Sequence, residues 1–333
     1  MNSWENKFNY NPTNVLLNSN NYAIEYFTKR DLLNEKVESI QKIWELEEVQ
    51  KILNKQKDDG TWEYIGMKTN IFPKHHYPLV QTWKEFRTLV KNYELNKTNP
   101  SCKKAAEFIF SCQSDEGDIR GMIGNQYATY YTGAMLAMLI RAGYESDPRV
   151  DKGMKWLISM RQEDKGWTIP ILTHDFDMKT QHKLTSGENS VPVERDRSKP
   201  FSHNWTDMVL RAFAVHPIYI KSQEAKIAGS LLKSRFFKKD FYSSYKSESY
   251  WMRFVFWWPN LLTSLDSLSR LGFSNKDEDI KKGLDWFIDN QQKDGLWKLN
   301  YIPGKETSDN KINKLRQYWL CLNICRMFKR FYN

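Results

Sequence analysis

A stretch of 21 residues occurs twice in this chain, and the two copies align without a gap. Asp147–Trp167 reads DPRVDKGMKWLISMRQEDKGW, and Asp277–Trp297 reads DEDIKKGLDWFIDNQQKDGLW. Eight of the 21 aligned positions are identical, including the pairs Trp156/Trp286 and Trp167/Trp297. An internal repeat of this kind is typical of proteins built from copies of one supersecondary unit, and it restricts the fold more than any other feature of the sequence.

The repeat unit reads as an amphipathic helix followed by a turn. Val150, Met154 and Leu157 recur with helical spacing, and the second copy has apolar residues at the same places. This periodicity predicts one buried stripe on each helix. Asp147 stands where an N-cap belongs, and Pro148 suits the first turn. The Gln, Asp, Gly and Trp that follow are interpreted as a structural turn that folds the indole back onto the helix.

Further helices can be read from the same pattern. Weaker copies of the turn end expected helices over 38–57 and 100–113, and a degenerate copy is expected over 222–237. Longer apolar helices are expected over 78–95, 127–144, 204–219, 255–273 and 312–331, with a lone helix near 20–33. We therefore predict an all-α chain of helix pairs, which can close into a ring or stay open as a solenoid. Residues 1–36 are expected to form an N-terminal cap, and residues 37–333 a single domain.

The repeated Gln-x-x-x-Gly-x-Trp turns between paired helices resemble those of the squalene cyclase/protein prenyltransferase superfamily, the terpenoid cyclase-like proteins. The phrases GNQYATYYTGA, FSHNWTDMVLRAF and FWWPNLLTSLDSLS are more closely similar to uncharacterised bacterial and archaeal prenyltransferase/squalene-oxidase repeat proteins. The resemblance implies an α/α toroid of about five to six helix pairs in two concentric rings. It also implies motif-bearing helices on the outside and a central cavity near the N-terminal ends of the inner helices.

The charge and the cysteine content of the chain indicate which kinds of partner to expect. The formal net charge is +10, from 50 basic and 40 acidic residues, which favours an anionic partner or a lysine-rich solvated surface. No interleaved Arg/aromatic strip is present, so no nucleic acid is expected, whereas association with a membrane surface stays open. The four cysteines form no Cys-x-x-Cys pair, and we expect neither a metal nor a cofactor. Without an apolar run of 18 residues or a signal peptide, the chain reads as cytoplasmic, at most peripheral to a membrane.

Three polar residues near expected inner-helix starts are candidate catalytic groups: Asp118, His203 and Asp207. His203 and Asp207 are four residues apart, so on a helix they share a face and could act as an oriented acid/base pair. Simple N-terminal capping of the helix is the alternative. Asp118 lies in a glycine-rich loop and could instead pair with Arg120.

Aromatic and polar residues around the same helix starts are candidate substrate-binding groups. Aromatic faces can line an apolar pocket and stabilise positive charge, although core packing explains the same residues. Arg253, within the aromatic run 250–258, could bind an anion or stack on a ring. The full set is Arg120, Asn125, Gln126, Tyr127, Tyr130, Tyr131, Trp251, Arg253, Trp257 and Trp258.

The irregular stretch 168–202 is expected to be a lid, a binding loop or a disordered segment. It contains Asp175 and Asp177, which partly match the Asp-x-Asp-Asp acid motif of class II cyclases. Met178 replaces the last aspartate of that motif. The chain therefore lacks the complete motif, and whether it is an enzyme stays open.

The resemblance makes a terpenoid cyclase-like function the first hypothesis: an acid-initiated reaction of an isoprenoid, diphosphate-bearing or other apolar substrate in an aromatic-lined cavity. A prenyltransferase β-like subunit would need a zinc set of Asp, Cys and His, and no Asp-x-Cys occurs here. The alternatives are a non-catalytic lipid- or peptide-binding toroid and a carbohydrate-active toroid enzyme. The latter would need two carboxylates that face one cleft.

Overall fold

The structure is a computed structural model that describes residues 4–187, 190–242, 247–255 and 257–333. Within these residues helices dominate, and the only named strand is the short β1 (Met122–Asn125). The predicted all-α class is therefore confirmed. The chain divides into two compact units, one formed by Met1–Ser39 with Gly229–Asn333 and the other by Ile40–Ala228.

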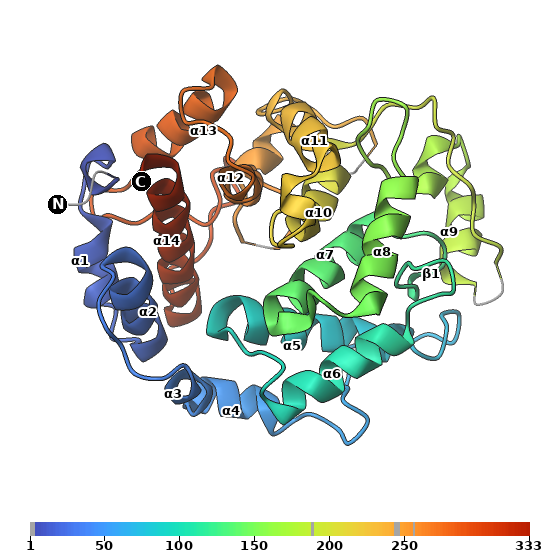
Figure 1. The fold of residues 1–333 in the computed structure, drawn as a ribbon, viewed down its shortest axis with the longest axis horizontal. Helices are drawn as coiled ribbons and strands as arrows, with labels where there is room; N and C mark the ends of the chain where they lie inside the picture. The colour runs from blue at the N-terminus through green and yellow to red at the C-terminus, as the bar shows by residue number, and fades with distance from the viewer. Residues whose placement is uncertain (1–3, 188–189, 243–246, 256) are drawn as a thin grey trace. The chain divides into compact units, whose positions relative to one another are not determined.

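The unit Ile40–Ala228 contains most of the helices that the sequence predicts (Figure 1). They are α3 (Gln41–Trp44), α4 (Glu47–Leu53), α5 (His76–Tyr93), α6 (Pro100–Ser111), α7 (Thr129–Leu139), α8 (Pro148–Ser159), α9 (Met178–Ser186), α10 (His203–Phe213) and the first part of α11 (Gln223–Lys233). Helix α7 continues into a π-helical turn, Ile140–Tyr144.

The other unit brings the two ends of the chain together. Its helices are α1 (Pro12–Leu17), α2 (Tyr22–Phe27), α12 (Leu261–Arg270), α13 (Glu278–Asp289) and α14 (Lys311–Tyr332). Helix α14 packs against α1, α2 and α12, and α12 packs against α13. The N-terminal segment thus shares a core with the C-terminal helices.

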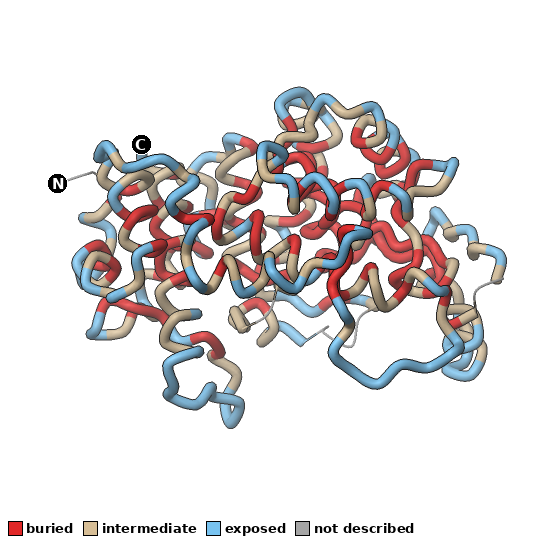
Figure 2. Tube along the Cα trace, turned by 90° about the horizontal axis from the view of Figure 1, so that it is seen from below, coloured by how far each residue is buried: buried red, intermediate tan, exposed pale blue. Residues whose placement is uncertain are grey.

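Helices of the unit Ile40–Ala228 pack in two layers. Helix α7 contacts both α5 and α10 in one layer, and α6 and α8 lie against α5 and α7 in the other. Figure 2 shows long buried stretches along the helices and mostly exposed loops. The motif-bearing helices α6 and α8 bury one stripe each, whereas α7 is buried almost all round, as expected for a helix covered on every side.

Where a motif turn carries a tryptophan, the indole caps the helix before it, whereas the turn after α6 has Ile119 at this place. In three copies the indole N–H donates to the backbone carbonyl ten residues earlier, in or next to the last turn of that helix. The pairs are Trp62–Ile52 (2.7 Å), Trp167–Leu157 (2.6 Å) and Trp297–Phe287 (2.7 Å). Each indole therefore supplies a donor to a carbonyl near the helix end, where carbonyls lack intrahelical partners.

The glutamine at the start of each turn joins it to the next motif-bearing helix. The Gln113 amide donates to Gly117 O at 2.7 Å and to Arg149 O at 2.9 Å, in the first turn of α8. The Gln56 amide makes the same two bonds, to Gly60 O and to Ser101 O in α6.

The equivalent residue in the last copy of the turn is Gln291. Its amide donates to Gly295 O and to Tyr10 O, just ahead of α1. Gln291, and not Gln292 one residue later, therefore makes the linking bonds. In the third copy Arg161 takes the place of the glutamine and approaches Glu224 of α11 at 3.8 Å.

One residue in each turn has a left-handed backbone. Gly60, Gly117 and Gly295 have φ values of 84°, 117° and 83°, and Lys165 takes the same place with φ 76°. At Gly60 a Cβ would lie 2.4 Å from the Lys104 carbonyl oxygen of α6. Glycine at this place therefore permits both the turn and the close approach of the next helix.

Two expected segments differ in the structure. Helix α12 begins at Leu261 and not near 255, because Pro259 precedes Asn260, which forms a capping box with Thr263. The region expected to be irregular over 168–202 contains α9, whose N-cap is Asp177. Asp177 is thus engaged in capping and not in an acid motif, while Glu188 and Asn189 lie outside the described residues.

We predict that Gly60→Ala lowers the free energy of unfolding by about 2 kcal/mol or more, because left-handed backbone and the Lys104 contact both oppose a Cβ. Urea unfolding followed by circular dichroism measures the change. Gly304→Ala is the matched control: Gly304 also has a positive φ (69°), but a Cβ there would meet nothing within 4 Å. Equal losses in both variants would show that the approach of α6 contributes nothing.

Lys165→Gly should have the opposite effect. A non-glycine residue at φ 76° is strained, so glycine is expected to raise the free energy of unfolding by about 0.5–1 kcal/mol. The melting temperature should rise by a few degrees. A lower melting temperature would mean that the Lys165 side chain stabilises the turn by more than its backbone strain costs.

Candidate functional site

Helices α7 and α10 form the most extensive helix contact in the unit Ile40–Ala228. They approach closely because Gly133 has no side chain: a Cβ there would lie 2.6 Å from the Cα of Val209. Ten of the 11 residues of α7 are buried, and Tyr131 is the exception. Ten of the 11 residues of α10 are also buried, and Arg211 is the exception. Each helix therefore presents one partly exposed side chain.

An aromatic cluster lies at the N-terminal ends of these two helices. The Tyr130 ring lies 4.3 Å from the Tyr131 ring and 4.6 Å from the Trp205 ring, measured between centroids. Tyr130 and Trp205 are buried, and burial raises the pKa of the Tyr130 phenol well above its usual value. The phenol consequently stays neutral, and the cluster offers apolar π surface next to the partly exposed Tyr131.

A charged group accompanies the aromatic cluster. The Asp207 carboxylate is fully buried and accepts hydrogen bonds from Arg211 Nε, at 3.0 Å, and Arg211 Nη2. Arg211 and Tyr131 both act electrostatically on Arg87 of α5, whose pKa is lowered to about 10 chiefly by burial. Three neighbouring helices thus bring together two arginines, one carboxylate and an aromatic wall.

The side chain of Asp118 is hydrogen-bonded within its own motif turn and loop. Its side chain is fully buried, accepts from Arg120 Nε at 2.9 Å and also bonds Ser114. Its backbone carbonyl accepts from Ser114 N within the motif turn. Arg120 reaches on to Glu116 and lies 4.9 Å from the Tyr127 ring centroid. The pairing with Arg120 that the sequence left open is present, and the Asp118 carboxylate is engaged by Arg120 and Ser114.

Asn125 and Gln126 bind the chain itself. Asn125 Nδ2 donates to Ser190 O, and Gln126 donates to Val191 O while its Oε1 accepts from Val193 N. These contacts tie residues 190–193 of the segment after α9 to the loop that precedes α7. The amides proposed for substrate binding are therefore engaged with the polypeptide backbone in this structure.

Tyr127 lies against the same segment. Its hydroxyl contacts Glu116 at 2.8 Å and Glu194 at 3.2 Å. Burial, followed by these two carboxylates, raises the pKa of the Tyr127 phenol. Tyr127 thus links the motif turn to the segment after α9.

The remaining candidates, Trp251, Arg253, Trp257 and Trp258, belong to the other unit. Trp251 is buried and its indole donates to Lys238 O at 3.0 Å, which is a packing role. Arg253 lies 5.5 Å from the Tyr250 ring centroid, so its predicted stacking on an aromatic ring is present. Trp257 and Trp258 contact each other at 5.0 Å and are partly exposed.

Sequence reasoning missed Arg87, Trp205 and Arg211. Arg211 lies one helical turn after Asp207, so the i, i+4 pair was visible in the sequence. Arg87 interrupts the apolar pattern of its helix in the sequence. Only the packing of α5 against α7 shows that this charge lies near Tyr131 and Arg211.

The described residues contain no cluster of three or more His, Cys, Asp or Glu side chains able to hold a metal ion. No helix among them is both long and apolar enough to cross a membrane.

We predict that Asp118→Asn lowers the free energy of unfolding by about 2–3 kcal/mol, because it removes the buried charge partner of Arg120 and leaves the exposed Glu116 to pair with it. Chemical denaturation measures the loss. Glu116→Gln is the matched control, since Glu116 contacts the same arginine from an exposed position and should cost less than about 1 kcal/mol. If the Asp118 variant were as stable as the wild type, the structural role assigned to this carboxylate would be wrong.

No family model and no curated protein matches the chain. Among solved structures, a protein from Actinoplanes has a TM-score of 0.47 and 12% identity over 99% of this chain and 90% of that one. A variant of the type II terpene cyclase MstE from Scytonema, in complex with geranylgeranyl dihydroxybenzoate, has a TM-score of 0.45 and 11% identity over 99% and 87%. A protein described as a novel alpha-amylase from Clostridium perfringens has a TM-score of 0.39 and 10% identity over 99% and 86%. These names cover unlike reactions, so the similarity selects none of them.

Proposed function

We propose that the chain is a terpenoid cyclase-like protein that holds an isoprenoid or other apolar substrate against the aromatic cluster of α7 and α10. The observation that supports this proposal is the contrast within these helices, which are buried except at Tyr131 and Arg211. A largely buried helix pair with one aromatic and one cationic side chain near solvent suits an amphiphilic substrate. Arg87 and Arg211 would take an anionic head such as a diphosphate.

The aromatic cluster supplies the chemistry that such a substrate needs. The faces of Tyr130 and Trp205 carry negative π charge, which stabilises a carbocation or an allylic cation nearby. Their burial excludes water, which would otherwise quench such an intermediate. The ring of Tyr131 extends this wall toward solvent.

His203 and Asp207 are the residues we propose for proton transfer. Both are buried in the first turns of α10, one helical turn apart and beside the aromatic Trp205. Asp118 does not share this proposal, since Arg120 and Ser114 occupy its carboxylate. In the proposed reaction the Asp207–Arg211 ion pair would open when substrate binds. Asp207 would then take up a proton from solvent and pass it to the substrate, and deprotonation of the final cation would return a proton to solvent.

That ion pair favours a second candidate function, which is binding of a lipid without catalysis. Asp118 and Asp207 are the two buried carboxylates proposed as acids, and each is paired with an arginine. The same aromatic wall and arginines would then select and hold an amphiphile. The two candidates share a binding site and differ only in whether a product forms.

We predict that the protein binds geranylgeranyl diphosphate with quenching of tryptophan fluorescence, and that Tyr131→Leu weakens binding about tenfold by removing the aromatic face. Tyr22→Leu is the matched control, because Tyr22 is an exposed tyrosine, 43% accessible, in the other unit. Absence of binding of both this diphosphate and squalene would contradict both candidates.

Product analysis by gas chromatography and mass spectrometry separates the candidates. A hydrocarbon product that falls about 100-fold or more in Asp207→Asn supports the cyclase-like enzyme. Tight binding with no product in the wild-type chain supports the lipid-binding protein.

A further inference from the structure

A pocket of about 470 Å³ lies on the unit formed by Met1–Ser39 and Gly229–Asn333, and none of its lining residues is a candidate site residue named from the sequence. Six of its seven lining residues come from one side of α13, at the spacing of successive helical turns: Glu278, Lys281, Lys282, Asp285, Trp286 and Asp289. The opposite side of α13 is buried and carries Ile280, Gly283, Leu284 and Phe287. The seventh lining residue is Phe237, which follows α11 in the sequence.

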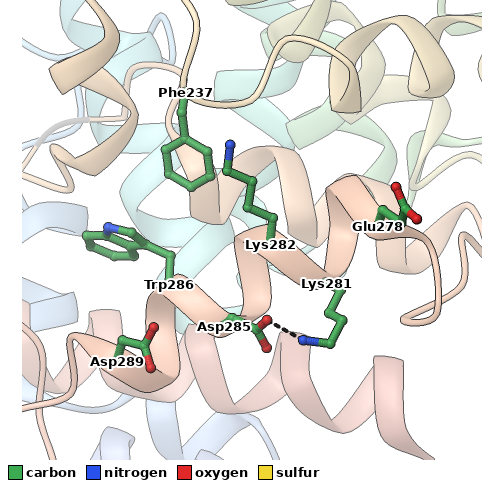
Figure 3. Close-up of a pocket in the computed structure, with 7 residues that line it drawn as sticks. All are labelled: Phe237, Glu278, Lys281, Lys282, Asp285, Trp286 and Asp289. Atoms are coloured by element: carbon green, nitrogen blue, oxygen red, sulfur yellow. Dashed lines mark hydrogen bonds and ion pairs between the residues drawn. The ribbon is translucent and has the colours of Figure 1, made fainter.

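Phe237 stands over this face of α13. Figure 3 shows Trp286 and Lys282 projecting from the helix toward the Phe237 ring, and Lys282 Nζ lies 5.2 Å from the ring centroid. Phe237 has a left-handed backbone with φ 60°, which is costly for a bulky residue. The preceding Phe236 is buried against Trp251, so the backbone at this point sends one ring into the core and the next over α13.

Trp286 forms the second aromatic wall. Its ring contacts Tyr301 at 4.9 Å and Phe254 at 5.8 Å, which fix its orientation. The indole remains partly exposed at the pocket. The equivalent tryptophan of the other repeat copy, Trp156, is buried and packs against Tyr127. The same repeat position therefore serves the core in one copy and a surface pocket in the other.

The charges of the pocket are mixed. Three carboxylates and two ammonium groups line it, and one pair, Lys281–Asp285, is a salt bridge on the helix surface (Figure 3). An anionic ligand would meet an excess of carboxylates. A cationic ligand would find Phe237 already covered by the Lys282 ammonium group.

A neutral polyhydroxylated ligand suits this combination of aromatic walls and mixed charges. A sugar ring stacks its C–H face on an indole, while its hydroxyls donate to carboxylates and accept from ammonium groups. A purely apolar ligand would displace water from charged side chains without offering them hydrogen bonds. The volume is also within the range of roughly 300–1,000 Å³ that is usual for small-ligand sites.

We propose that this pocket binds a neutral saccharide, with Trp286 as the stacking platform, Phe237 as the opposite wall, and Asp285, Asp289 and Lys282 as the hydrogen-bonding groups. The pocket is separate from the aromatic cluster of α7 and α10, and its function does not depend on the nature of that site.

The test is isothermal titration of the whole chain with maltohexaose and with cellohexaose. We expect at least one of them to bind with a Kd of about 0.1–1 mM, a range suited to a small open site. Raising the NaCl concentration from about 0.05 to 0.5 M should change the Kd by less than about twofold, because a neutral ligand is not subject to ionic screening.

Variants assign the binding to the pocket. Trp286→Ala should weaken binding more than tenfold, and Trp286→Tyr should restore most of it because an aromatic face remains. Phe237→Ala provides a second test that leaves the contacts of Trp286 with Tyr301 and Phe254 intact. Phe241→Ala is the matched control, since Phe241 is an exposed aromatic (55%) that does not line the pocket, and it should bind like the wild type.

Several outcomes would overturn the proposal. One is the absence of binding of either hexasaccharide at about 20 mM, far above the expected Kd. Another is an equal loss of binding in Phe241→Ala. A third is salt-dependent binding of tetramethylammonium or inorganic phosphate at Trp286 in place of saccharide. None of these outcomes bears on isoprenoid binding, so the two proposals fail separately.

Discussion

Hydrogen bonds from side chains to backbone carbonyls hold the repeat units of this protein together. A motif turn ends each amphipathic helix, where carbonyls lack intrahelical partners. The tryptophan N–H reaches back to one such carbonyl, and the glutamine amide reaches forward to the next motif-bearing helix. These two bonds fix both the direction of the turn and the distance to the next unit. The alignment helps the amphipathic helices to bury their apolar stripes against neighbours.

The third copy of the turn keeps its geometry with different residues at two positions. Arg161 replaces the glutamine in the third copy, and an ion pair with Glu224 replaces the amide bonds. Lys165 replaces the glycine there and accepts a left-handed backbone. The turn therefore keeps its geometry although two of its residue types change. It requires a side-chain donor at the first position and a left-handed backbone at the fifth, and Arg161 and Lys165 meet these requirements.

Residues that look functional in the sequence divide into two groups in the structure. Asp118, Asn125 and Gln126 hold the protein's own turn and the segment after α9. Tyr131 and Asp207 instead lie with Arg87 and Arg211 in the one place where the buried helices α7 and α10 present polar or aromatic groups near solvent. Residue spacing alone could not tell the two groups apart. Each contains an aspartate followed within four residues by an arginine that pairs with it, Asp118 with Arg120 and Asp207 with Arg211.

From the residues alone we could predict the all-α class, the repeat and the helix cap at Asp147, and pairing with Arg120 was one of the two roles left open for Asp118. These features depend on residues within a few turns of one another, so local periodicity and capping chemistry are enough to predict them. The start of α12 and the existence of α9 were also encoded locally, in the Asn260–Thr263 capping box and the Asp177 cap, but the prediction overlooked those signals. Tertiary structure decided the use of Gln291 and the different environments of Trp156 and Trp286. These depend on which distant backbone or side chain lies alongside, because burial and hydrogen-bond partners come from packing between helices and not from the local order of residues.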